Sequence, residues 1–370
     1  MKNVVVIGGG ISGLLTAIQI VNAGIPCSVI EKKRFPFHRV CGEYISNEAV
    51  PFLKSLDLFP SEYEPADIKR FQLSSISGKS EILNLDLGGF GISRYLFDNF
   101  LYEKAKSAGV EFYLDEEAQE IQFADDAFLV RTSRKSLEAH LVIGSFGKRS
   151  KIDVYLKRKF IQKRSPFVGV KYHIRADHPH DLIALHNFDG GYCGISNVED
   201  GRTNLCYLTH RDNIKKFKSI SEMEIAVLHR NPFLKRIFLN SEFLFDKPET
   251  INEISFETKS PVEDHVLMTG DAAGMITPLC GNGMAMAIQS SKLLSVLLIK
   301  NIRQNETRDV LERTYAHAWN SQFRNRLWYG RQVQNLFGNR TASNIAVNLV
   351  VHLPFIANAM IRGTHGEPFV

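Results

Sequence analysis

The chain has 370 residues, of which 44% are hydrophobic and 23% charged. This composition is typical of folded globular proteins and unlike that of disordered, collagen-like or multi-span membrane proteins. At about 150 residues per domain, the length allows two to three domains. Lysine and arginine number 45 against 40 aspartate and glutamate, a net charge of +5. Because so small an excess indicates nucleic-acid binding only when it is clustered, we expect no nucleic acid as a partner.

The cysteines of the chain are odd in number, widely spaced and without a C-x-x-C pair; they are Cys27, Cys41, Cys193, Cys206 and Cys280. Such spacing indicates neither a disulfide framework nor a zinc site. The sequence therefore predicts no bound metal and a protein of the reducing cytoplasm.

The first 31 residues predict a strand, a helix and a second strand. Residues 3–7 are a β-branched run, residues 14–21 have apolar side chains at helical spacing, and residues 27–30 are apolar again. No charge lies between Lys2 and Glu31, a pattern also seen in signal peptides and membrane anchors. A spanning helix needs roughly 20 unbroken apolar residues, however, and glycines break this run early. We therefore predict a buried strand–helix–strand unit.

A glycine-rich motif, Gly8-Gly9-Gly10-Ile11-Ser12-Gly13, joins the first strand to the helix and fits G-x-G-x-x-G. In this context Gly8 permits the tight turn, Gly10 lets the backbone approach a pyrophosphate, and Gly13 allows the helix to pack closely on the sheet. Ser12 lies in the same turn. The motif predicts a dinucleotide site, the alternative being a glycine-rich turn in an unrelated α/β protein.

Glu31 stands at the end of the second strand, where an acid accepts hydrogen bonds from an adenosine ribose. An acid at this position disfavours a 2′-phosphate. The sequence therefore favours FAD or NAD over NADP as the bound dinucleotide.

A second signature lies far along the chain. An apolar run at residues 266–269 precedes Gly270-Asp271-Ala272-Ala273-Gly274, then Pro278, then Gly281-Asn282-Gly283 before a predicted helix over residues 284–299. With Val40-Cys41-Gly42-Glu43, and with Ile92-Ser93-Arg94 followed by Phe97 and Asp98, these motifs resemble the FAD-dependent superfamily of group A flavin monooxygenases, geranylgeranyl reductases and flavin-dependent halogenases. The resemblance covers most of the chain and identifies the dinucleotide as FAD.

The resemblance implies roles for several residues. Asp271 is expected to hydrogen-bond the ribityl chain, and Arg39 and Arg94 are expected near the pyrophosphate or ribityl region. Backbone N–H groups of the Gly281-Asn282-Gly283 turn, together with the positive end of the following helix, would face the pyrimidine edge of the flavin; Pro278 precedes this turn.

Cys41 and Glu43 are the candidate catalytic residues, because their segment is expected to pass near the isoalloxazine ring. Glu43 could donate or relay a proton, or it could be a structural carboxylate bonded to the backbone or to Arg39. Cys41 could shape the ring face or assist protonation, or simply pack. His173, His186 and Tyr192 are interpreted as parts of the wall of the substrate cavity.

Departures from the superfamily patterns bear on the reaction. Group A hydroxylases usually carry Asp-Gly where this chain has Phe146-Gly147, and His where it has Gly274; geranylgeranyl reductases resemble it better at Gly274 and share Cys41-Gly42. The tryptophan motifs of reductases and halogenases are absent. Our first hypothesis is an NAD(P)H-driven monooxygenase that hydroxylates a hydrophobic phenolic or polyketide-like molecule. The alternative is an FAD-dependent reductase of C=C bonds in a polyprenyl lipid, and the third a flavin-binding protein without turnover.

The predicted fold is α/β, with a Rossmann-like FAD-binding domain, a mixed β-sheet substrate domain and C-terminal helices. The FAD-binding domain is assigned to residues 1–67, 92–155 and 258–300, the substrate domain to 68–91 and 156–257, and the helical region to 301–370. Partial alternation predicts antiparallel strands at 167–176, 182–186, 192–196 and 203–209, and residues 101–109 predict a crossover helix.

The region after residue 312 interleaves arginines with aromatic and apolar side chains: Arg313, Arg324, Arg326, Arg331 and Arg340 alternate with Trp319, Phe323, Leu327, Trp328, Tyr329, Leu336 and Phe337, and residues 345–360 are apolar. One interpretation is a set of helices packed on the FAD-binding domain. The other is a basic amphipathic surface that contacts a membrane, so that a cytoplasmic protein would be membrane-associated.

Overall fold

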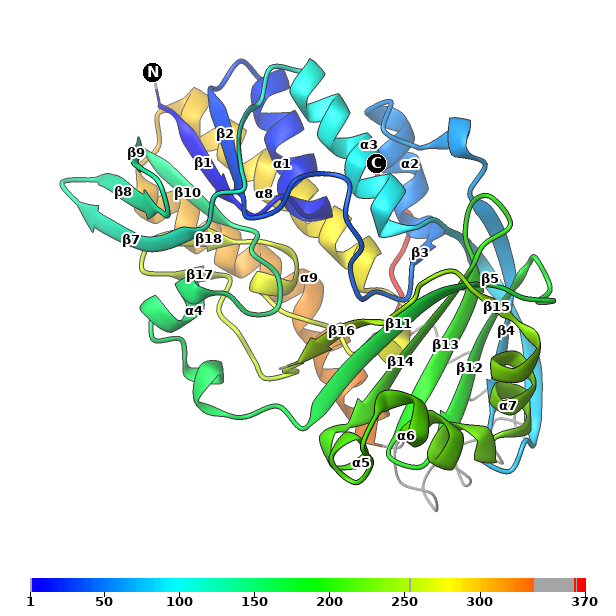
Figure 1. Cartoon of the computed structure of the whole chain (residues 1–370). Helices are drawn as coiled ribbons and strands as arrows, with labels where there is room; N and C mark the ends of the chain where they lie inside the picture. The colour runs from blue at the N-terminus through cyan, green and yellow to red at the C-terminus, as the bar shows by residue number, and fades with distance from the viewer. Residues whose placement is uncertain (1, 253, 336–362, 364) are drawn as a thin grey trace.

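The structure is a computed structural model, and it describes residues 2–252, 254–335, 363 and 365–370. Two sheets meet at an angle, with helices on their outer sides (Figure 1). A six-stranded sheet has the order β17-β18-β10-β1-β2-β6 and is parallel except for β17. Its strands are β1 (Val4–Ile7), β2 (Cys27–Glu31), β6 (Glu111–Leu114), β10 (Leu141–Gly144), β17 (Val262–Glu263) and β18 (Val266–Met268).

The central strands of the parallel sheet are buried throughout, which explains why they read as continuous apolar runs rather than alternating ones. Helices α1 (Ile11–Asn22), α3 (Arg94–Ser107) and α8 (Gly283–Gln304) pack together on one face. A separate three-stranded sheet is formed by β7 (Ala118–Ala124), β8 (Ala127–Thr132) and β9 (Ser136–Ala139), next to α4 (Lys151–Tyr155).

Helix α3 begins earlier than the sequence predicted. The expected crossover helix covered residues 101–109, whereas α3 starts at Arg94 and ends at Ser107. Its start is set by Ser93, whose hydroxyl accepts a hydrogen bond from the backbone N–H of Leu96, a typical N-cap. The prediction did not use this cap and therefore began the helix too late.

A nine-stranded sheet forms the second layer, with the order β15-β11-β14-β13-β12-β4-β5-β3 and with β16 paired to β11. It is mixed, because β12 runs parallel to β4 while its other pairs are antiparallel. Its strands are β3 (Tyr44–Ser46), β4 (Ala66–Ser74), β5 (Ser80–Gly91), β11 (Phe167–Arg175), β12 (Leu182–Phe188), β13 (Gly191–Asn197), β14 (Thr203–His210), β15 (Glu242–Phe243) and β16 (Glu249–Asn252). The predicted fold class, a Rossmann-like unit beside a mixed sheet, is thereby confirmed.

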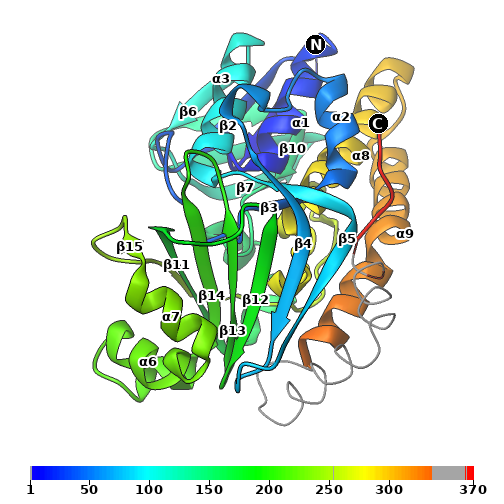
Figure 2. The same cartoon turned by 90° about the vertical axis from the view of Figure 1, so that its right-hand side faces the viewer.

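Short helices cover the outer face of the nine-stranded sheet, where they share a core of buried side chains with β11–β14. They are α5 (Arg211–Lys215), α6 (Ile220–Val227) and α7 (Pro232–Asn240), and Figure 2 shows α6 and α7 against this face. The inner face points toward the parallel sheet. The domain boundaries stay a prediction; strands of the parallel sheet come from residues 4–31, 111–144 and 262–268, and those of the large sheet from 44–46, 66–91 and 167–252.

The last described helix, α9 (Arg308–Asn335), packs against α8, and α2 (Val50–Ser55) lies near the returning C-terminal segment (Figure 2). There the backbone N–H of Phe369 donates to the carbonyl of Glu48, and its ring contacts Phe52. Among the described helices, α8 is long and apolar enough to cross a membrane, but half of its apolar stretch is buried inside the protein. Its contacts with α1 and α9 are typical of a core helix.

Candidate functional site

A cavity of about 600 Å³ lies between the two sheets. One wall consists of segments at the carboxyl ends of β1, β2, β10 and β18, the edge where parallel sheets bind their ligands. The opposite wall is the inner face of the nine-stranded sheet, and the N-terminus of α8 and the last turns of α9 close one side.

The structure brings most of the predicted site residues to this cavity. Those that line it are Gly8, Gly10, Ser12, Glu31, Arg39, Cys41, Glu43, Arg94, Asp271, Pro278, Gly281 and Gly283. Gly13 and Asn282 do not line it. Gly13 packs where a Cβ atom would lie 2.1 Å from the carbonyl oxygen of Gly8, which agrees with its predicted packing role, and Asn282 is the N-cap residue of α8.

The turn before α1 forms an anion cradle. Gly8 has φ +106°, and a Cβ atom there would lie 2.3 Å from the carbonyl oxygen of Ser145. At Gly10 the nearest atom to a Cβ would be an Arg94 nitrogen at 3.8 Å, so this backbone is open toward the cavity. Helix α1 has no side-chain cap and no acid in its first turn. Its free backbone N–H groups and the helix dipole therefore fit a pyrophosphate.

Ser12 lines the cavity, and its hydroxyl also holds the start of α1 in place. Its hydroxyl donates to the Thr269 hydroxyl at 3.1 Å and lies 3.2 Å from that of Ser145. These contacts tie the helix to the ends of β10 and β18. The glycine cradle is therefore held from three strands.

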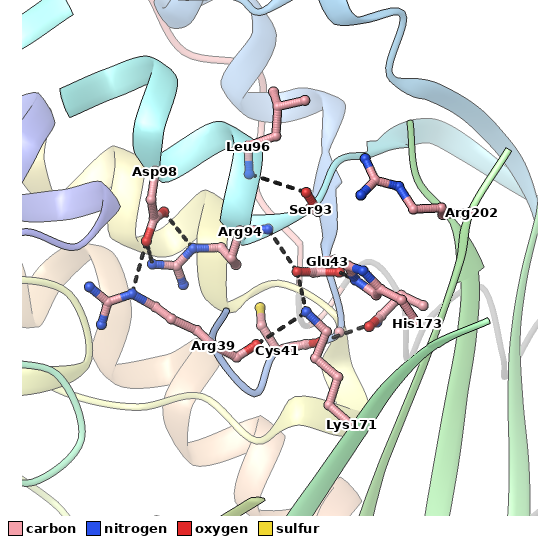
Figure 3. A network of polar contacts seen from close by, with 12 residues as sticks. Arg39, Cys41, Glu43, Ser93, Arg94, Leu96, Asp98, Lys171, His173 and Arg202 are labelled. Atoms are coloured by element: carbon pink, nitrogen blue, oxygen red, sulfur yellow. Dashed lines mark hydrogen bonds and ion pairs between the residues drawn. The ribbon is translucent and has the colours of Figure 1, made fainter. Parts of the chain in front are cut away.

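Polar side chains lie beside the cradle, and Figure 3 shows three of them, Arg39, Arg94 and Asp98. The carboxylate of Glu31 accepts the backbone N–H of Gly9 at 2.9 Å and contacts Arg39 at 3.3 Å. The buried carboxylate of Asp98 accepts from Arg39 at 2.9 Å and, through both oxygens, from Arg94 at 2.6 and 2.7 Å. Burial alone would lower the pKa of Arg94, but Asp98 raises it above its ordinary value. Asp98 thus orients both arginines beside the first turn of α1.

Glu43 stands at the centre of a buried cluster (Figure 3). Its carboxylate contacts the ammonium of Lys171 at 2.5 Å and Nε2 of His173 at 2.6 Å, and it accepts the backbone N–H of Arg94 at 2.7 Å. Burial would raise the pKa of Glu43, but Lys171 and His173 outweigh it and lower the pKa to about 2. Glu43 is thus ionised at neutral pH, which disfavours a proton donor. Its catalytic role stays a prediction.

The cavity also contains thiols that keep their protons. Burial raises the pKa of Cys41, and it raises the pKa of Cys206 to about 12 and that of Cys280 to about 11. All five cysteines are free. Cys41 therefore presents an uncharged thiol to the cavity, and its predicted catalytic role is not tested by this geometry.

The turn before α8 combines predicted and unpredicted residues. Pro278–Cys280 forms one 3-10 turn, Gly281 has φ +65°, and α8 starts without a side-chain cap. The ring of Tyr44 lies 3.4 Å from where a Cβ of Gly281 would be, and it also lines the cavity. Sequence reasoning missed Tyr44. The one pointer to it was its neighbour Glu43, which was predicted to lie near the flavin. Gly281 and Gly283 line the cavity, and the place of this turn beside the pyrimidine edge of a flavin stays a prediction.

The three residues predicted to form the wall of the substrate cavity, His173, His186 and Tyr192, lie in different surroundings. Tyr192 lines the cavity, whereas His173 binds Glu43 and His186 bonds Ser74 at 2.8 Å. Burial lowers the pKa of His186 to about 3, so this ring is neutral. Sequence reasoning also missed Lys171, although a lysine inside the apolar run of β11 was a signal for a buried partner.

The wall on the large sheet is apolar except at β16, where Glu249 and Thr250 line the cavity. The side chains and backbone that β4, β5, β12, β13 and β14 contribute carry no charge: Phe71, Leu73, Leu85, Ile183, Ala184, Leu185, Tyr192, Gly194, Ile195, Cys206, Tyr207 and Leu208. In the described part of the chain, no group of His, Cys, Asp and Glu side chains is arranged to hold a metal ion. The cavity thus joins a polar, backbone-rich half to an apolar half.

These features define a class: a dinucleotide-binding oxidoreductase whose uncapped helix and glycine cradle fit the pyrophosphate of FAD. A family model described as FAD binding domain matches residues 1–320. The chain therefore belongs to the FAD-binding domain family, and it is an FAD-dependent oxidoreductase.

Relatives and solved structures agree with this assignment. The chain is 23% identical over 354 residues to digeranylgeranylglycerophospholipid reductase 1 of Methanopyrus kandleri, covering 90% of each chain. A geranylgeranyl bacteriochlorophyll reductase-like protein of Thermoplasma acidophilum is similar in structure with a TM-score of 0.79 and 18% identity, over 98% of this chain and 97% of that one. PqsL of Pseudomonas aeruginosa, a probable FAD-dependent monooxygenase, has a TM-score of 0.75 and 16% identity over 93% and 98%. At these identities the solved structures support the fold alone.

Proposed function

We propose that the protein is an FAD-dependent reductase that saturates C=C bonds in an apolar, polyprenyl-type lipid. The observation that best supports this proposal is the uncharged wall that β4, β5 and β12–β14 turn toward the flavin-binding edge. Such a wall favours a long apolar substrate through burial of its surface. The reductase relative, named for a digeranylgeranylglycerophospholipid, supports the same choice.

The setting of Gly274 also favours reduction over hydroxylation. A Cβ atom at this position would lie 2.6 Å from the ring of Trp319 and 2.9 Å from Leu327, so the histidine usual in group A hydroxylases has no room. Phe146 lines the cavity at the place of their usual acid. The NAD(P)H-driven hydroxylase of a phenolic or polyketide-like molecule remains the competing hypothesis.

FAD, when bound, supplies the hydride for the double bond. The chain contributes the cavity: apolar side chains hold the lipid and exclude water, and the start of α8 stabilises negative charge at its N-terminus. In this proposal the protonated thiol of Cys41 gives a proton to the second carbon, whereas ionised Glu43 holds Lys171 and His173. We propose NAD(P)H as the electron donor.

Anaerobic mixing tests the proposal. The holoprotein, reduced in the absence of oxygen, is mixed with a geranylgeranyl lipid, and flavin absorbance and product mass are followed. We expect the flavin to be reoxidised while the lipid gains hydrogen. Reoxidation that requires oxygen and yields a hydroxylated phenol would establish the monooxygenase instead, and no turnover with either substrate would leave a flavin-binding protein without catalysis.

We also propose that the protein is cytoplasmic and that it contacts anionic membranes through the outer face of α9. Arg324, Trp328 and Arg331 follow each other at helical spacing, and Trp328 is 57% exposed. On the inner face of the same helix, Val333 lines the apolar half of the cavity. Residues 336–362, which include Leu336, Phe337, Arg340 and the apolar run, lie outside the described residues.

Vesicle binding tests this surface. The protein should co-sediment with anionic vesicles at low salt and less at high salt. The double variant R324E/W328A should lose this binding, whereas K216E, at an exposed lysine beyond α5, should keep it. Equal binding of wild type and R324E/W328A would exclude α9 as the contact.

A further inference from the structure

Lys259 is a buried cation behind the cavity wall. Its side chain is 7% exposed, and its ammonium donates to the carbonyl oxygen of Asp271 at 2.7 Å and to that of Lys148 at 2.8 Å. The ammonium also lies 4.4 Å from the centre of the Phe160 ring. These are contacts that a buried ammonium uses when no carboxylate is its direct partner.

The two carbonyl groups belong to the segments that form the flavin edge of the cavity. Lys148 follows β10 and Asp271 follows β18, and both residues line the cavity. The two strands are neighbours in the sheet, and β10 lies next to β1, which leads into the glycine cradle. One side chain therefore links two loops that flank the site of the pyrophosphate and ribityl chain.

The surroundings of Lys259 carry charges of both signs. Asp153 of α4 and the side chain of Asp271 attract the ammonium, while Arg158 repels it. Asp153 is already paired with Arg158 at 2.8 Å, and Arg158 also lies 3.7 Å from Glu263 of β17. The Lys148 ammonium is turned to the carbonyl of Asn252. An anion bound against the two loops would add to the attraction that these carboxylates exert on the ammonium.

We propose that Lys259 is a positioning residue for FAD, which fixes the loops after β10 and β18 and places a positive charge behind the part of the cavity wall that these loops form. It does not line the cavity, and so it acts through the two loops rather than by contact with the cofactor. The inference rests on FAD binding alone and holds for a reductase or a monooxygenase equally.

A pH dependence follows. Burial lowers the pKa of Lys259 to about 8, and a bound anion favours the protonated form and raises it. FAD affinity should then be full below pH 8 and fall as the pH rises above it, because binding must take up a proton. The charged groups that act on the ammonium are Asp153 and Asp271, which attract it, and Arg158, which repels it and is paired with Asp153 and Glu263.

The test measures FAD release from the full-length holoprotein by flavin fluorescence, for wild type, K259M and K163M. Lys163 is exposed and paired with Glu257 on the surface, so K163M is the matched control. We expect K259M to weaken FAD binding roughly tenfold or more, the worth of one or two charge-assisted hydrogen bonds, and to abolish the loss of affinity above pH 8. K163M should behave as wild type.

Two outcomes overturn the proposal. K259M could retain wild-type affinity and pH profile, or it could lose thermal stability as the apoprotein while FAD affinity stays unchanged, which would make Lys259 a structural residue only. Should K259M not fold, wild type decides: an affinity that is the same at about pH 7 and about pH 10 excludes the role.

Discussion

The two walls of the cavity hold a ligand by different means. The wall on the parallel sheet consists of glycine backbone, an uncapped helix start and oriented arginines. Its fit to a pyrophosphate therefore depends largely on main-chain atoms. The wall on the large sheet consists, except at Glu249 and Thr250 of β16, of apolar side chains from strands that pair far apart in sequence. The first wall is thus specific for one cofactor. In the second wall, single substitutions can change which substrate is bound.

The two walls also differ in the space around their glycines, measured as the distance from a Cβ atom built on each glycine to its nearest neighbour. In the cradle, a Cβ at Gly8 would lie 2.3 Å from a backbone oxygen, and one at Gly13 would lie 2.1 Å from another. In the opposite wall, a Cβ at Gly194 would find its nearest neighbour at 3.6 Å, an ordinary contact. An added methyl group should therefore be excluded at Gly8 and Gly13 and accepted at Gly194.

The largest effect is expected for Gly8→Ala. The substitution places a methyl group against the carbonyl of Ser145 at φ +106°, where alanine is strained. The variant should lose bound FAD on purification, measured by flavin absorbance per protein. Gly194→Ala should retain the cofactor, and a fully loaded Gly8→Ala protein would contradict the division between the walls.

The sequence predicted the first wall better than the second, for physical reasons. The cradle and Glu31 lie within one strand–helix–strand unit, so their spacing alone places them together. The cluster of Glu43, Lys171 and His173 joins positions about 130 residues apart, with separations of 128 and 130, and no local pattern encodes such a contact. Asp98 was part of a motif, but its bonds to two arginines needed coordinates.

The buried cluster of Glu43, Lys171 and His173 connects the two walls of the cavity, and a substitution at Glu43 can disrupt it. Glu43→Gln leaves Lys171 buried without a counter-charge, and it should reduce the free energy of unfolding by about 3 kcal/mol, measured by chemical denaturation. Glu242→Gln, in the exposed pair with Arg175, should change it by less than about 1 kcal/mol. Equal effects would mean that the buried cluster does not join the walls.

The same variant has a pH signature. The pKa of Glu43 is lowered from 4.5 to about 2 on folding, so its contribution is complete above pH 4.5 and is lost as the pH falls toward 2. Wild type should therefore lose stability faster than Glu43→Gln over this interval. Parallel curves for the two proteins would contradict an ionised Glu43.

A smaller effect is expected at the apolar wall. Leu185 is 6% exposed and lines the cavity, and Leu185→Gln would place an amide against an apolar substrate. The KM for a polyprenyl lipid should rise roughly tenfold, the cost of a poorly paired polar group, while FAD content stays unchanged. Leu239→Gln, at a residue 63% exposed on α7, should leave both unchanged. A loss of FAD in Leu185→Gln would show that the walls are not independent.

The smallest effect is expected at Tyr192, and it distinguishes shape from polarity in the apolar wall. Its hydroxyl lies 3.4 Å from the amide oxygen of Gln334, a long hydrogen bond. Tyr192→Phe keeps the ring and should leave the KM for the lipid within about twofold, whereas Tyr192→Ala removes the ring and should raise it. Steady-state kinetics on both variants decide the point: a large increase with Tyr192→Phe would mean that this wall recognises a polar group of the substrate, so that its selectivity is not by shape alone.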